Sequence, residues 1–344
     1  MVTIKDVAQK AGVTPATVSM ALNGKPSISV ETRRRIERIA SQLGYVPSAT
    51  AKTLRTSRSH TLGLIVGNLT NGFFLDIIYA VEEYASSRGY SIFICDAERS
   101  SDKVVSSMKA LAARGVDGVI ITLGFYPDGK LEEEVRRISS EGIKVLTLTS
   151  AAQFDGVPIV RQGETDEALA LVEKVCSLGH RRIGLLSSPR DSWLNRTRVN
   201  TMRRALELNG VLDEDLVDYC EVNVDAGQKC AFDLLSRHPE ITAVMCVNDQ
   251  VAIGAMNAAR CIGLDIPGEI SITGFDGIEM SRIITPHLTT VHIPRYEMGL
   301  VGCRNIIEWI ENPDARIPGE TLISSTFVEG QTLGICRDAK EDKK

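Results

Sequence analysis

The first fifty residues hold two short amphipathic patterns separated by a glycine, and this arrangement constrains the fold more than any other feature of the chain. Apolar residues recur at helical spacing up to Gly12, and Thr3 with Asp6 can form a capping box at the start of that helix. Thr14 followed by Pro15 is typical of the start of a second helix. Two helices joined through such a turn predict a helix-turn-helix, whose second helix enters the DNA major groove.

A third helix is predicted from Glu31 to Leu43, between the cap residue Ser29 and Gly44. A solvated helix face would by itself explain its four arginines, Arg33, Arg34, Arg35 and Arg38. The distribution of charge favours another interpretation. Residues 1–60 carry ten lysines and arginines against three acidic residues, a net charge of +7, and because the whole chain carries −5, the remainder carries −12. An acidic protein with one basic end indicates a nucleic-acid-binding head on a body that binds something else.

The segment between Gly44 and Thr61 has the composition of a linker. Two helical turns are also compatible with its residues Ala49, Ala51, Lys52, Leu54 and Arg55. A helix of that length is too short to be stable alone in water. We therefore expect a linker that gains helical structure only on its target.

From Thr61 onward, short apolar runs alternate with longer amphipathic ones, which predicts parallel strands with helices between them. The pattern resumes after residues 163–178, so two similar lobes are implied. A helix from Tyr296 to Glu311 and a final strand pair within Thr321–Leu333 suggest that the chain crosses back between the lobes. The predicted strands are Leu62–Val66, Ser91–Cys95, Val119–Thr122, Val145–Leu148, Pro158–Val160, Ile183–Leu186, Tyr219–Val224, Ala243–Val247, Ser271–Gly274 and Thr289–Ile293.

Polar and aromatic side chains follow many of these predicted strands. In open parallel sheets, ligands bind outside the carboxyl ends of the strands, so these residues should face one cleft between two lobes. They are Asn68 to Phe74, Asp96, Trp193 to Arg198, Asn248, Asp249, Phe275 and Asp276. Carboxylate, amide and guanidinium groups beside aromatic faces suit a polyhydroxylated ring.

Several of these residues have an alternative, structural explanation. Asn71 and Asp249 are explained equally well as helix N-caps, and Phe74 is explained better as a core residue. Arg198 would fit a surface ion pair, and Asp276 would fit a turn cap before Gly277. The sequence leaves these alternatives open.

Composition and missing motifs exclude several classes of protein. The eight cysteines contain no Cys-x-x-Cys pair, and the five histidines form no ligand spacing with them, so we expect buried thiols and no metal site. His180, just before a strand, is better explained as structural.

The chain shows neither a secretory signal nor an apolar run long enough to span a membrane, so we expect a cytoplasmic protein. The phosphate-loop, nucleophile-elbow and zinc-protease motifs are missing, so we expect no enzyme and no cofactor.

A set of motifs spread along the chain is specific in combination. The motifs are Thr3–Ala8, Ala16–Ser19, Gly44–Pro47, Ala51–Leu54, Val116–Ile120, Gly179–Ile183, Asn248–Asp249 and Gly274–Asp276. With them the chain resembles the LacI/GalR (lactose/galactose repressor) family of bacterial transcription regulators over nearly its whole length. The resemblance implies an all-α helix-turn-helix headpiece plus a hinge helix, followed by an α/β type I periplasmic-binding-protein-like core of two doubly wound parallel-sheet lobes. The implied ranges are 1–46 for the headpiece, 47–60 for the hinge helix, 61–161 and 294–319 for the N-terminal lobe, 162–293 and 320–338 for the C-terminal lobe, and 339–344 for a charged tail.

The resemblance assigns DNA contacts to residues of the second helix and of the hinge. The base-reading positions fall on Pro15, Ala16 and Met20, which offer only apolar contact, for example to thymine methyl groups. Specificity should therefore rest more on the hinge, where Leu54 matches a leucine that wedges into the central minor-groove step. The implied DNA-binding set is Thr3, Thr14, Pro15, Ala16, Thr17, Ser19, Met20, Asn23, Ala51, Lys52, Leu54 and Arg55.

The resemblance also assigns residues to an effector site between the lobes. Arg198 matches the family's ligand-contacting arginine, and Asn248 and Asp276 match its polar partners. The chain departs from the family where the usual aspartate at the lobe crossover is replaced within Arg161–Gly163, and where the usual Asn-Pro reads Asn71-Gly72. The expected effector-binding set is Phe73, Phe74, Asp96, Trp193, Arg198, Asn248 and Asp276.

We therefore expect a homodimeric, effector-controlled regulator, a repressor that associates with the bacterial nucleoid when bound to DNA. Each headpiece would cover half of a near-palindromic operator, and closure of the lobes around a sugar or sugar derivative would change the affinity for DNA. One alternative is a sugar-binding protein without a gene-regulatory role, for which the two lobes would suffice. Another is an enzyme on a doubly wound fold. The basic residues 1–60 favour the regulator.

Overall fold

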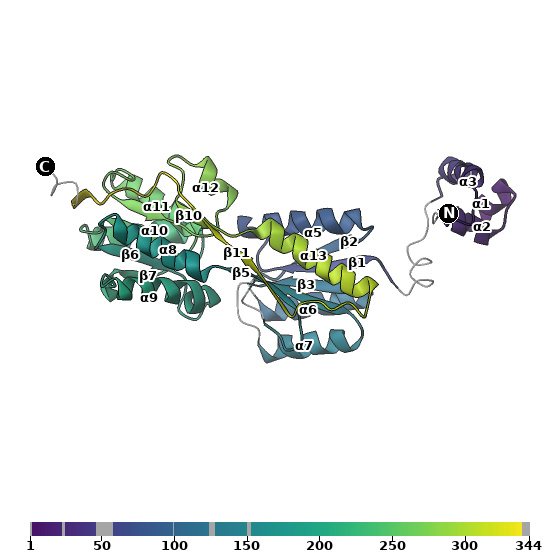
Figure 1. The fold of residues 1–344 in the computed structure, drawn as a ribbon, viewed down its shortest axis with the longest axis horizontal. Coiled ribbons are helices and arrows are strands. Elements are labelled where there is room, and N and C mark those ends of the chain that lie inside the picture. The colour runs from purple at the N-terminus through teal and green to yellow at the C-terminus, as the bar shows by residue number, and fades with distance from the viewer. Residues whose placement is uncertain are drawn as a thin grey trace. The chain divides into compact units, whose positions relative to one another are not determined.

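The computed structural model describes residues 2–22, 25–45, 58–98, 100–123, 128–149 and 153–338. These residues form two compact units, with the division between His60 and Thr61 (Figure 1). The first unit is the predicted helical headpiece, and the second is the predicted two-lobed α/β body. Among the described residues, no helix is both long and apolar enough to cross a bilayer.

The headpiece consists of α1 (Ile4–Ala11), α2 (Pro15–Leu22) and α3 (Val30–Leu43). The predicted helix starts are confirmed: Thr3 and Asp6 form the capping box of α1, and the Thr14 hydroxyl accepts a hydrogen bond from the Thr17 amide at 3.1 Å. Gly12 has φ +63°, a conformation that glycine adopts without steric cost, and it turns the chain from α1 towards α2. The helices share a small apolar core of Val7, Ala8, Ala11, Val18, Ala21, Ile36 and Ala40.

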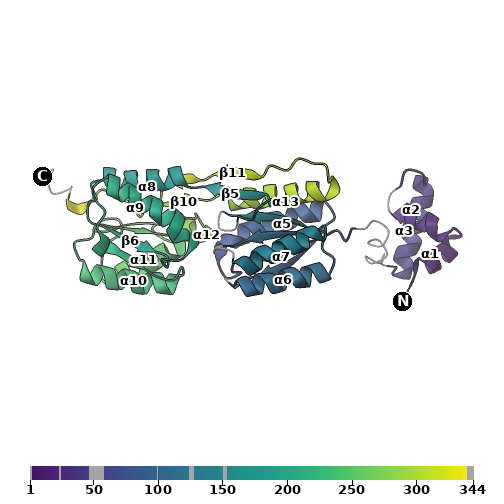
Figure 2. The same ribbon diagram turned by 90° about the horizontal axis from the view of Figure 1, so that it is seen from below.

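The first lobe is a six-stranded parallel sheet in the order β11-β5-β4-β3-β1-β2. Helices α5 and α13 pack against each other on one face of the sheet, and α6 and α7 pair on the other (Figure 2). Its strands are β1 (Thr61–Val66), β2 (Ser91–Asp96), β3 (Gly118–Thr122), β4 (Lys144–Leu148), β5 (Ile159–Gly163) and β11 (Glu320–Ser324), and its helices are α5 (Leu75–Ser87), α6 (Ser101–Ala113), α7 (Gly129–Ser140) and α13 (Arg295–Glu311).

The second lobe is a four-stranded parallel sheet in the order β7-β6-β8-β9, accompanied by the antiparallel pair β10-β12. Helices α8 and α9 pack together, as do α10 and α11. Its strands are β6 (Ile183–Ser187), β7 (Val217–Tyr219), β8 (Ala243–Cys246), β9 (Ser271–Thr273), β10 (Thr290–His292) and β12 (Thr326–Val328), and its helices are α8 (Thr165–Ser177), α9 (Asn200–Leu208), α10 (Val224–Arg237), α11 (Asp249–Cys261) and α12 (Glu279–Ile283).

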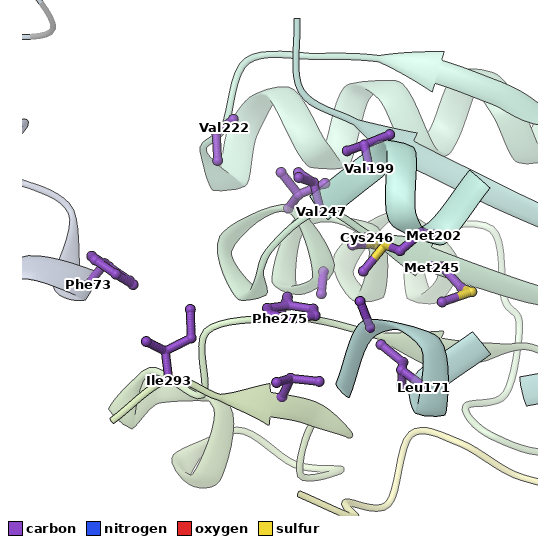
Figure 3. Packing of buried hydrophobic residues seen from close by; sticks show 14 of the residues in the cluster. Phe73, Leu171, Val199, Met202, Val222, Met245, Cys246, Val247, Phe275 and Ile293 are labelled. Carbon is purple, nitrogen blue, oxygen red and sulfur yellow. The ribbon is translucent and has the colours of Figure 1, made fainter. Parts of the chain in front are cut away.

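The chain passes between the lobes three times: between β5 and α8, between β10 and α13, and between β11 and β12. The first and third passages are joined, because the Ser325 amide donates to the Gly163 carbonyl at 3.0 Å. One apolar cluster includes residues of both lobes. Figure 3 shows Phe73 of the first lobe opposite Phe275 and Ile293. The two lobes thus face each other across the ends of their sheets.

Two strand predictions are wrong. The predicted strand Tyr219–Val224 ends at Tyr219, because the Asn223 side chain accepts from the Ala226 amide at 2.9 Å and caps α10. The predicted final strand pair does not pair with itself, since β11 lies parallel to β5 and β12 pairs with β10. Residues 320–324 therefore belong to the sheet of the N-terminal lobe, although we assigned 320–338 to the C-terminal one. Short apolar runs carry no signal for their partners.

Candidate functional site

A cavity lies where the carboxyl ends of strands from both lobes meet, as the end-of-strand rule predicts. Its empty volume is about 630 Å³, part of it open to solvent. The first lobe contributes lining residues after β1, β3 and β4 and from β5, and the second lobe contributes residues after β6, β7, β8 and β9. They are Gly67, Asn68, Asn71, Phe73, Phe74, Leu123, Thr149, Gln162, Trp193, Leu194, Arg198, Val222, Asn248 and Asp276.

Six of the seven residues expected to bind an effector line this cavity: Phe73, Phe74, Trp193, Arg198, Asn248 and Asp276. The seventh, Asp96, is not among the lining residues. Its carboxylate accepts from the backbone amides of Leu69 at 3.4 Å and Glu98 at 2.9 Å. The structure therefore places Asp96 as a support for the loop that follows β1.

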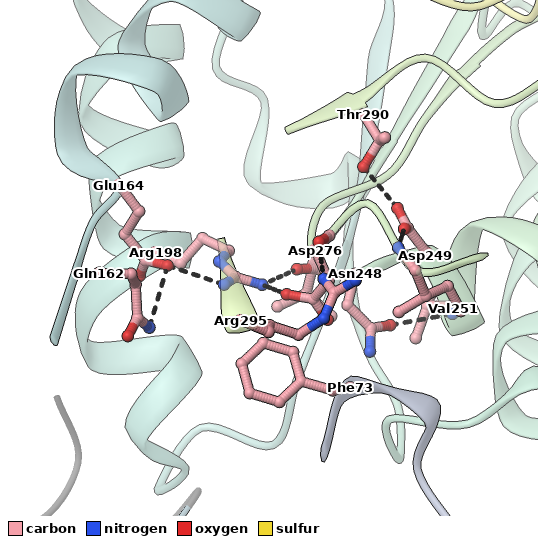
Figure 4. A network of polar contacts seen from close by, with 12 residues as sticks. Phe73, Gln162, Glu164, Arg198, Asn248, Asp249, Val251, Asp276, Thr290 and Arg295 are labelled. Carbon is pink, nitrogen blue, oxygen red and sulfur yellow. Dashed lines mark hydrogen bonds and ion pairs between the residues drawn. The ribbon is translucent and has the colours of Figure 1, made fainter. Parts of the chain in front are cut away.

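Arg198 is the centre of a buried ionic network shown in Figure 4. One Nη atom donates to Asp276 Oδ1 and to the Val247 carbonyl, both at 2.9 Å, and the other donates to Glu164 Oε2 at 2.7 Å. The guanidinium also lies 3.9 Å from the centre of the Phe275 ring. Because Arg198 is 2% exposed, the surface ion pair considered from the sequence is wrong.

Asp276 occupies an unusual turn at the end of β9. Its φ is +109° and that of Gly277 is +62°, so two successive residues lie in the left-handed half of backbone space. The amide of Asp276 donates to the Val291 carbonyl at 2.8 Å, which anchors the turn to β10. Burial raises the pKa of Asp276, although the charges of Arg198 and Arg295 oppose that shift.

Two amide side chains in the lining are helix caps as well. Asn71 accepts from the Phe73 amide at 3.0 Å, and Asn248 accepts from the Val251 amide at 3.0 Å. The cap role considered for Asn71 is thus confirmed. Asp249, in contrast, is not the cap of α11: its oxygens accept from the Ile278 amide and the Thr290 hydroxyl.

The aromatic residues contribute to both the cavity and the core. Phe73 and Phe74 meet edge to face with ring centres 5.2 Å apart, and they are 9% and 7% exposed. Both line the cavity, so the core role considered for Phe74 and the site role apply together. His180 is structural, since its ring nitrogens bond Thr242 Oγ1 and the Gly334 carbonyl, both at 3.0 Å.

Sequence reasoning did not single out Leu123, Thr149 or Val222 as lining residues. Leu123 and Thr149 come directly after β3 and β4, so the same end-of-strand rule would have found them. Val222 lies between β7 and α10, where the predicted strand was too long. Gln162 was noted only as a departure from the family pattern, yet it lines the cavity from within β5.

In the headpiece, the predicted base-reading residues Pro15, Ala16 and Met20 of α2 are exposed, whereas Val18 of the same helix is buried. Thr3 and Thr14 are exposed, while Thr17 and Ser19 are partly buried. The remaining expected contacts lie outside the residues that the structure describes; they are Asn23, Ala51, Lys52, Leu54 and Arg55.

Comparison with known proteins gives two family matches that cover both units. Residues 3–48 match the model of bacterial regulatory proteins of the lacI family, and residues 59–331 match the model of periplasmic binding proteins and the sugar-binding domain of the LacI family. The ribose operon repressor of Halalkalibacterium halodurans is 32% identical over 96% of this chain and 98% of its own length.

Two solved structures extend the similarity. The lac repressor dimer bound to operator and the anti-inducer ONPF aligns with a TM-score of 0.83 at 25% identity, over 97% of this chain and 99% of its own. A complex of the transcriptional regulator CelR with cellobiose aligns with a TM-score of 0.69 at 25% identity, over 96% and 100%. The predicted fold class and the predicted class of regulator are both confirmed. With a family model matching most of its length and a helix-turn-helix match at its start, the chain belongs to the LacI family of bacterial regulatory proteins.

Proposed function

We propose that this chain is a transcriptional repressor whose affinity for operator DNA is set by a small, uncharged, polyhydroxylated effector of the sugar class bound in the cavity between the lobes. It is a regulator rather than an enzyme. Relatives support the class of ligand, because one is a ribose operon repressor and a solved neighbour holds cellobiose. The chemistry of the cavity supports the absence of charge on the ligand.

Two buried polar atoms of the lining have no hydrogen-bond partner among the described residues: Arg198 Nε, a donor, and Gln162 Oε1, an acceptor. A buried polar group without a partner costs about 1–3 kcal/mol. A hydroxyl group both donates and accepts, so a ligand with several hydroxyls can satisfy both atoms. Phe73, Phe74 and Trp193 then provide apolar surface for the carbon-bound face of a sugar ring.

The same lining disfavours a phosphate ester. Arg198 is the only cationic side chain among the described lining residues, and its charge is already opposed by Asp276 and Glu164. An anionic group would meet the Asp276 carboxylate and a guanidinium that two carboxylates already neutralise, which is unfavourable at low dielectric. This compensated arginine is the observation on which the neutral ligand rests.

On the DNA side, we propose that a homodimer places two headpieces on the halves of a near-palindromic operator, in the cytoplasm and at the nucleoid. Pro15, Ala16 and Met20 would contact bases through apolar surface. Contacts to phosphate would come from the basic residues of the first sixty. Closure of the lobes on the effector would then change operator affinity through a coupling free energy.

Thermal unfolding in the presence of matched ligands tests the proposed effector. We expect that ribose, cellobiose or another neutral sugar raises the melting temperature by several degrees at saturating concentration, because a ligand bound to the folded state stabilises it by mass action. Ribose 5-phosphate and glucose 6-phosphate should give no shift. A larger shift with a phosphate ester than with its parent sugar would contradict the neutral class. An operator titration with the active sugar then measures regulation itself.

A further inference from the structure

Arg295, the first residue of α13, lies at the second passage of the chain between the lobes, and its guanidinium contacts both lobes. On the first lobe, Nε and Nη2 donate to Asp76 Oδ2 at 3.1 and 2.8 Å. On the second lobe, Nη1 donates to the Asp276 carbonyl and Nη2 donates to the Gly277 carbonyl at 2.9 Å. The Arg295 side chain is 2% exposed, so its bonds to the two carbonyls are shielded from water, whereas Asp76 at the other end is half exposed.

The second-lobe partners of Arg295 belong to the turn that carries the cavity carboxylate. Asp276 and Gly277 both have positive φ, and for Asp276 this conformation is sterically costly. The Asp276 side chain bonds Arg198 inside the cavity, while its carbonyl bonds Arg295 behind the cavity. Arg295 therefore holds the backbone from which a lining residue projects, without being a lining residue itself.

The first-lobe side of the contact is likewise attached to the cavity. The Arg295 guanidinium lies 5.6 Å from the centre of the Phe73 ring, close enough for a cation–π contact, and Phe73 lines the cavity. Asp76 is in the first turn of α5, directly after the short helix that contains Phe73. Figure 4 shows Arg295 beside Phe73 and Asp276.

We propose that Arg295 is a positioning residue that holds the cleft closed: it fixes the Asp276–Gly277 turn of the second lobe to Phe73 and Asp76 of the first. Opening of the lobes at this point breaks both of its bonds to the turn carbonyls. The Asp276 and Gly277 carbonyls then have to bond to water instead. The turn, which contains the strained Asp276, loses the hydrogen bonds that support its conformation. The equilibrium between open and closed cleft is thus set by a side chain that does not line the effector cavity.

The test uses Trp193, which lines the cavity and is 5% exposed. The chain has two tryptophans, so Trp309→Phe leaves Trp193 as the single emitter. In this background, acrylamide quenching of the unliganded full chain measures access of solvent to the cleft. We expect Arg295→Gln to raise the quenching constant about two-fold or more, and Asp76→Ala to raise it by a smaller factor.

Arg88→Gln is the matched control. Arg88 pairs with Glu311 and so joins α5 to α13 as well, but at the ends of the two helices away from the turn. This variant should leave the quenching of Trp193 unchanged. The proposal is overturned if Arg295→Gln and Asp76→Ala fold and are quenched like the parent, or if Arg88→Gln raises quenching equally. Should Arg295→Gln fail to fold, Asp76→Ala decides, because the Asp76 carboxylate is half exposed.

The consequence for regulation rests on the proposed function: a variant with an open cleft should bind the effector more weakly and respond less to it. The quenching experiment needs neither effector nor DNA. The two experiments are therefore independent. If no sugar shifts the melting temperature, quenching still tests the role of Arg295, and if quenching is unchanged, the melting-temperature screen still tests the sugar class.

Discussion

At the scale of single residues, the cleft is governed by one arginine between two carboxylates. The side chains of Arg198, Glu164 and Asp276 are 1%, 10% and 9% exposed, so three charges are buried together. Such a group is stable only while every charge keeps its partner. The network therefore joins the end of β5, the segment after β6 and the turn after β9 into one unit that depends on Arg198.

Arg198→Met should destabilise the second unit by about 3–5 kcal/mol, because it removes the guanidinium that directly pairs with both buried carboxylates, Glu164 and Asp276. Urea denaturation of the full chain measures this loss. Glu164→Gln is the control: it removes one carboxylate and leaves the Arg198–Asp276 pair intact, so it should cost less. If Glu164→Gln proved as destabilising as Arg198→Met, then the loss of stability in Arg198→Met could not be attributed to carboxylates left without the charge of the arginine.

Asp249 predicts a dependence of stability on pH. Burial, followed by the charge of Asp276, raises its pKa from 3.8 to about 7, although Thr290 and the Ile278 amide donate to its oxygens. Because the folded state holds this proton more tightly than the unfolded state, the contribution of Asp249 is full below about pH 4 and is lost as pH rises to 7. The change amounts to at most about 4 kcal/mol. The isosteric Asp249→Asn should flatten the unfolding free energy measured between pH 4 and 7, and identical pH curves for the two proteins would rule this assignment out.

Many of the residues that line the cavity can be predicted from their positions just after the strands. The rule that ligands bind beyond the carboxyl ends of parallel strands led to Phe73, Arg198, Asn248 and Asp276, because each follows a strand whose apolar run is visible in the sequence. It also led to Asp96, which follows β2 but supports a loop instead. The role of Arg295 could not be found this way, since its partners are two backbone carbonyls and a carboxylate distant in sequence.

At the scale of elements, α10 and α11 begin directly beside the cavity. Residues Val222 and Asn248 come just before them and line the cavity. The two helices pack at a point where their backbones touch: a Cβ on Gly254 would lie 2.3 Å from the Val224 carbonyl oxygen and 2.5 Å from the Gln228 amide nitrogen. The glycine therefore sets the distance between the helices.

Gly254→Ala should destabilise the protein by about 3 kcal/mol, since the obstructing atoms are backbone and cannot turn aside. Helix propensity alone predicts the opposite sign, a gain of about 1 kcal/mol. Gly129→Ala, at the start of α7, provides the control because a Cβ there meets nothing within 4 Å. Thermal unfolding of both variants separates the two effects, and a stabilised Gly254→Ala would refute the close crossing.

The sequence predicted elements well and their partners poorly. Helices of the headpiece are marked by caps and glycine turns within a few residues, so their bounds follow from local chemistry. The pairing of β11 with β5 and of β12 with β10 depends on which edge of which sheet is open. The five-residue run Glu320–Ser324 is too short, and its apolar pattern too weak, to predict which strand it pairs with. The end of β7 was missed because Asn223 was not recognised as a helix cap.

At the scale of the whole molecule, the two units carry opposite net charges that match their different functions. Residues 1–60 carry +7, and the body that holds the cavity carries −12. Attraction to phosphate is therefore strongest at the headpiece and the segment that follows it, and the proposed neutral effector would bind in an acidic body. Regulation requires that opening or closing of the cleft change the affinity for DNA through residues 46–57. These residues lie outside the part of the chain that the structure describes.

The last prediction concerns Leu54, one of those residues, which the family resemblance assigns as the wedge in the central minor-groove step. The predicted base-reading trio Pro15, Ala16 and Met20 can offer only apolar contacts, so a bend centred on Leu54 should supply a large share of sequence discrimination. Leu54→Ala should therefore weaken binding to a palindromic operator about 10- to 100-fold while leaving binding to random duplex DNA nearly unchanged, measured at one salt concentration. Lys52→Gln is the matched control, because loss of a phosphate contact should weaken both complexes alike. If Leu54→Ala weakened both complexes equally, the residue would be a general contact rather than a wedge, and the specificity of this repressor would have to come from α2 after all.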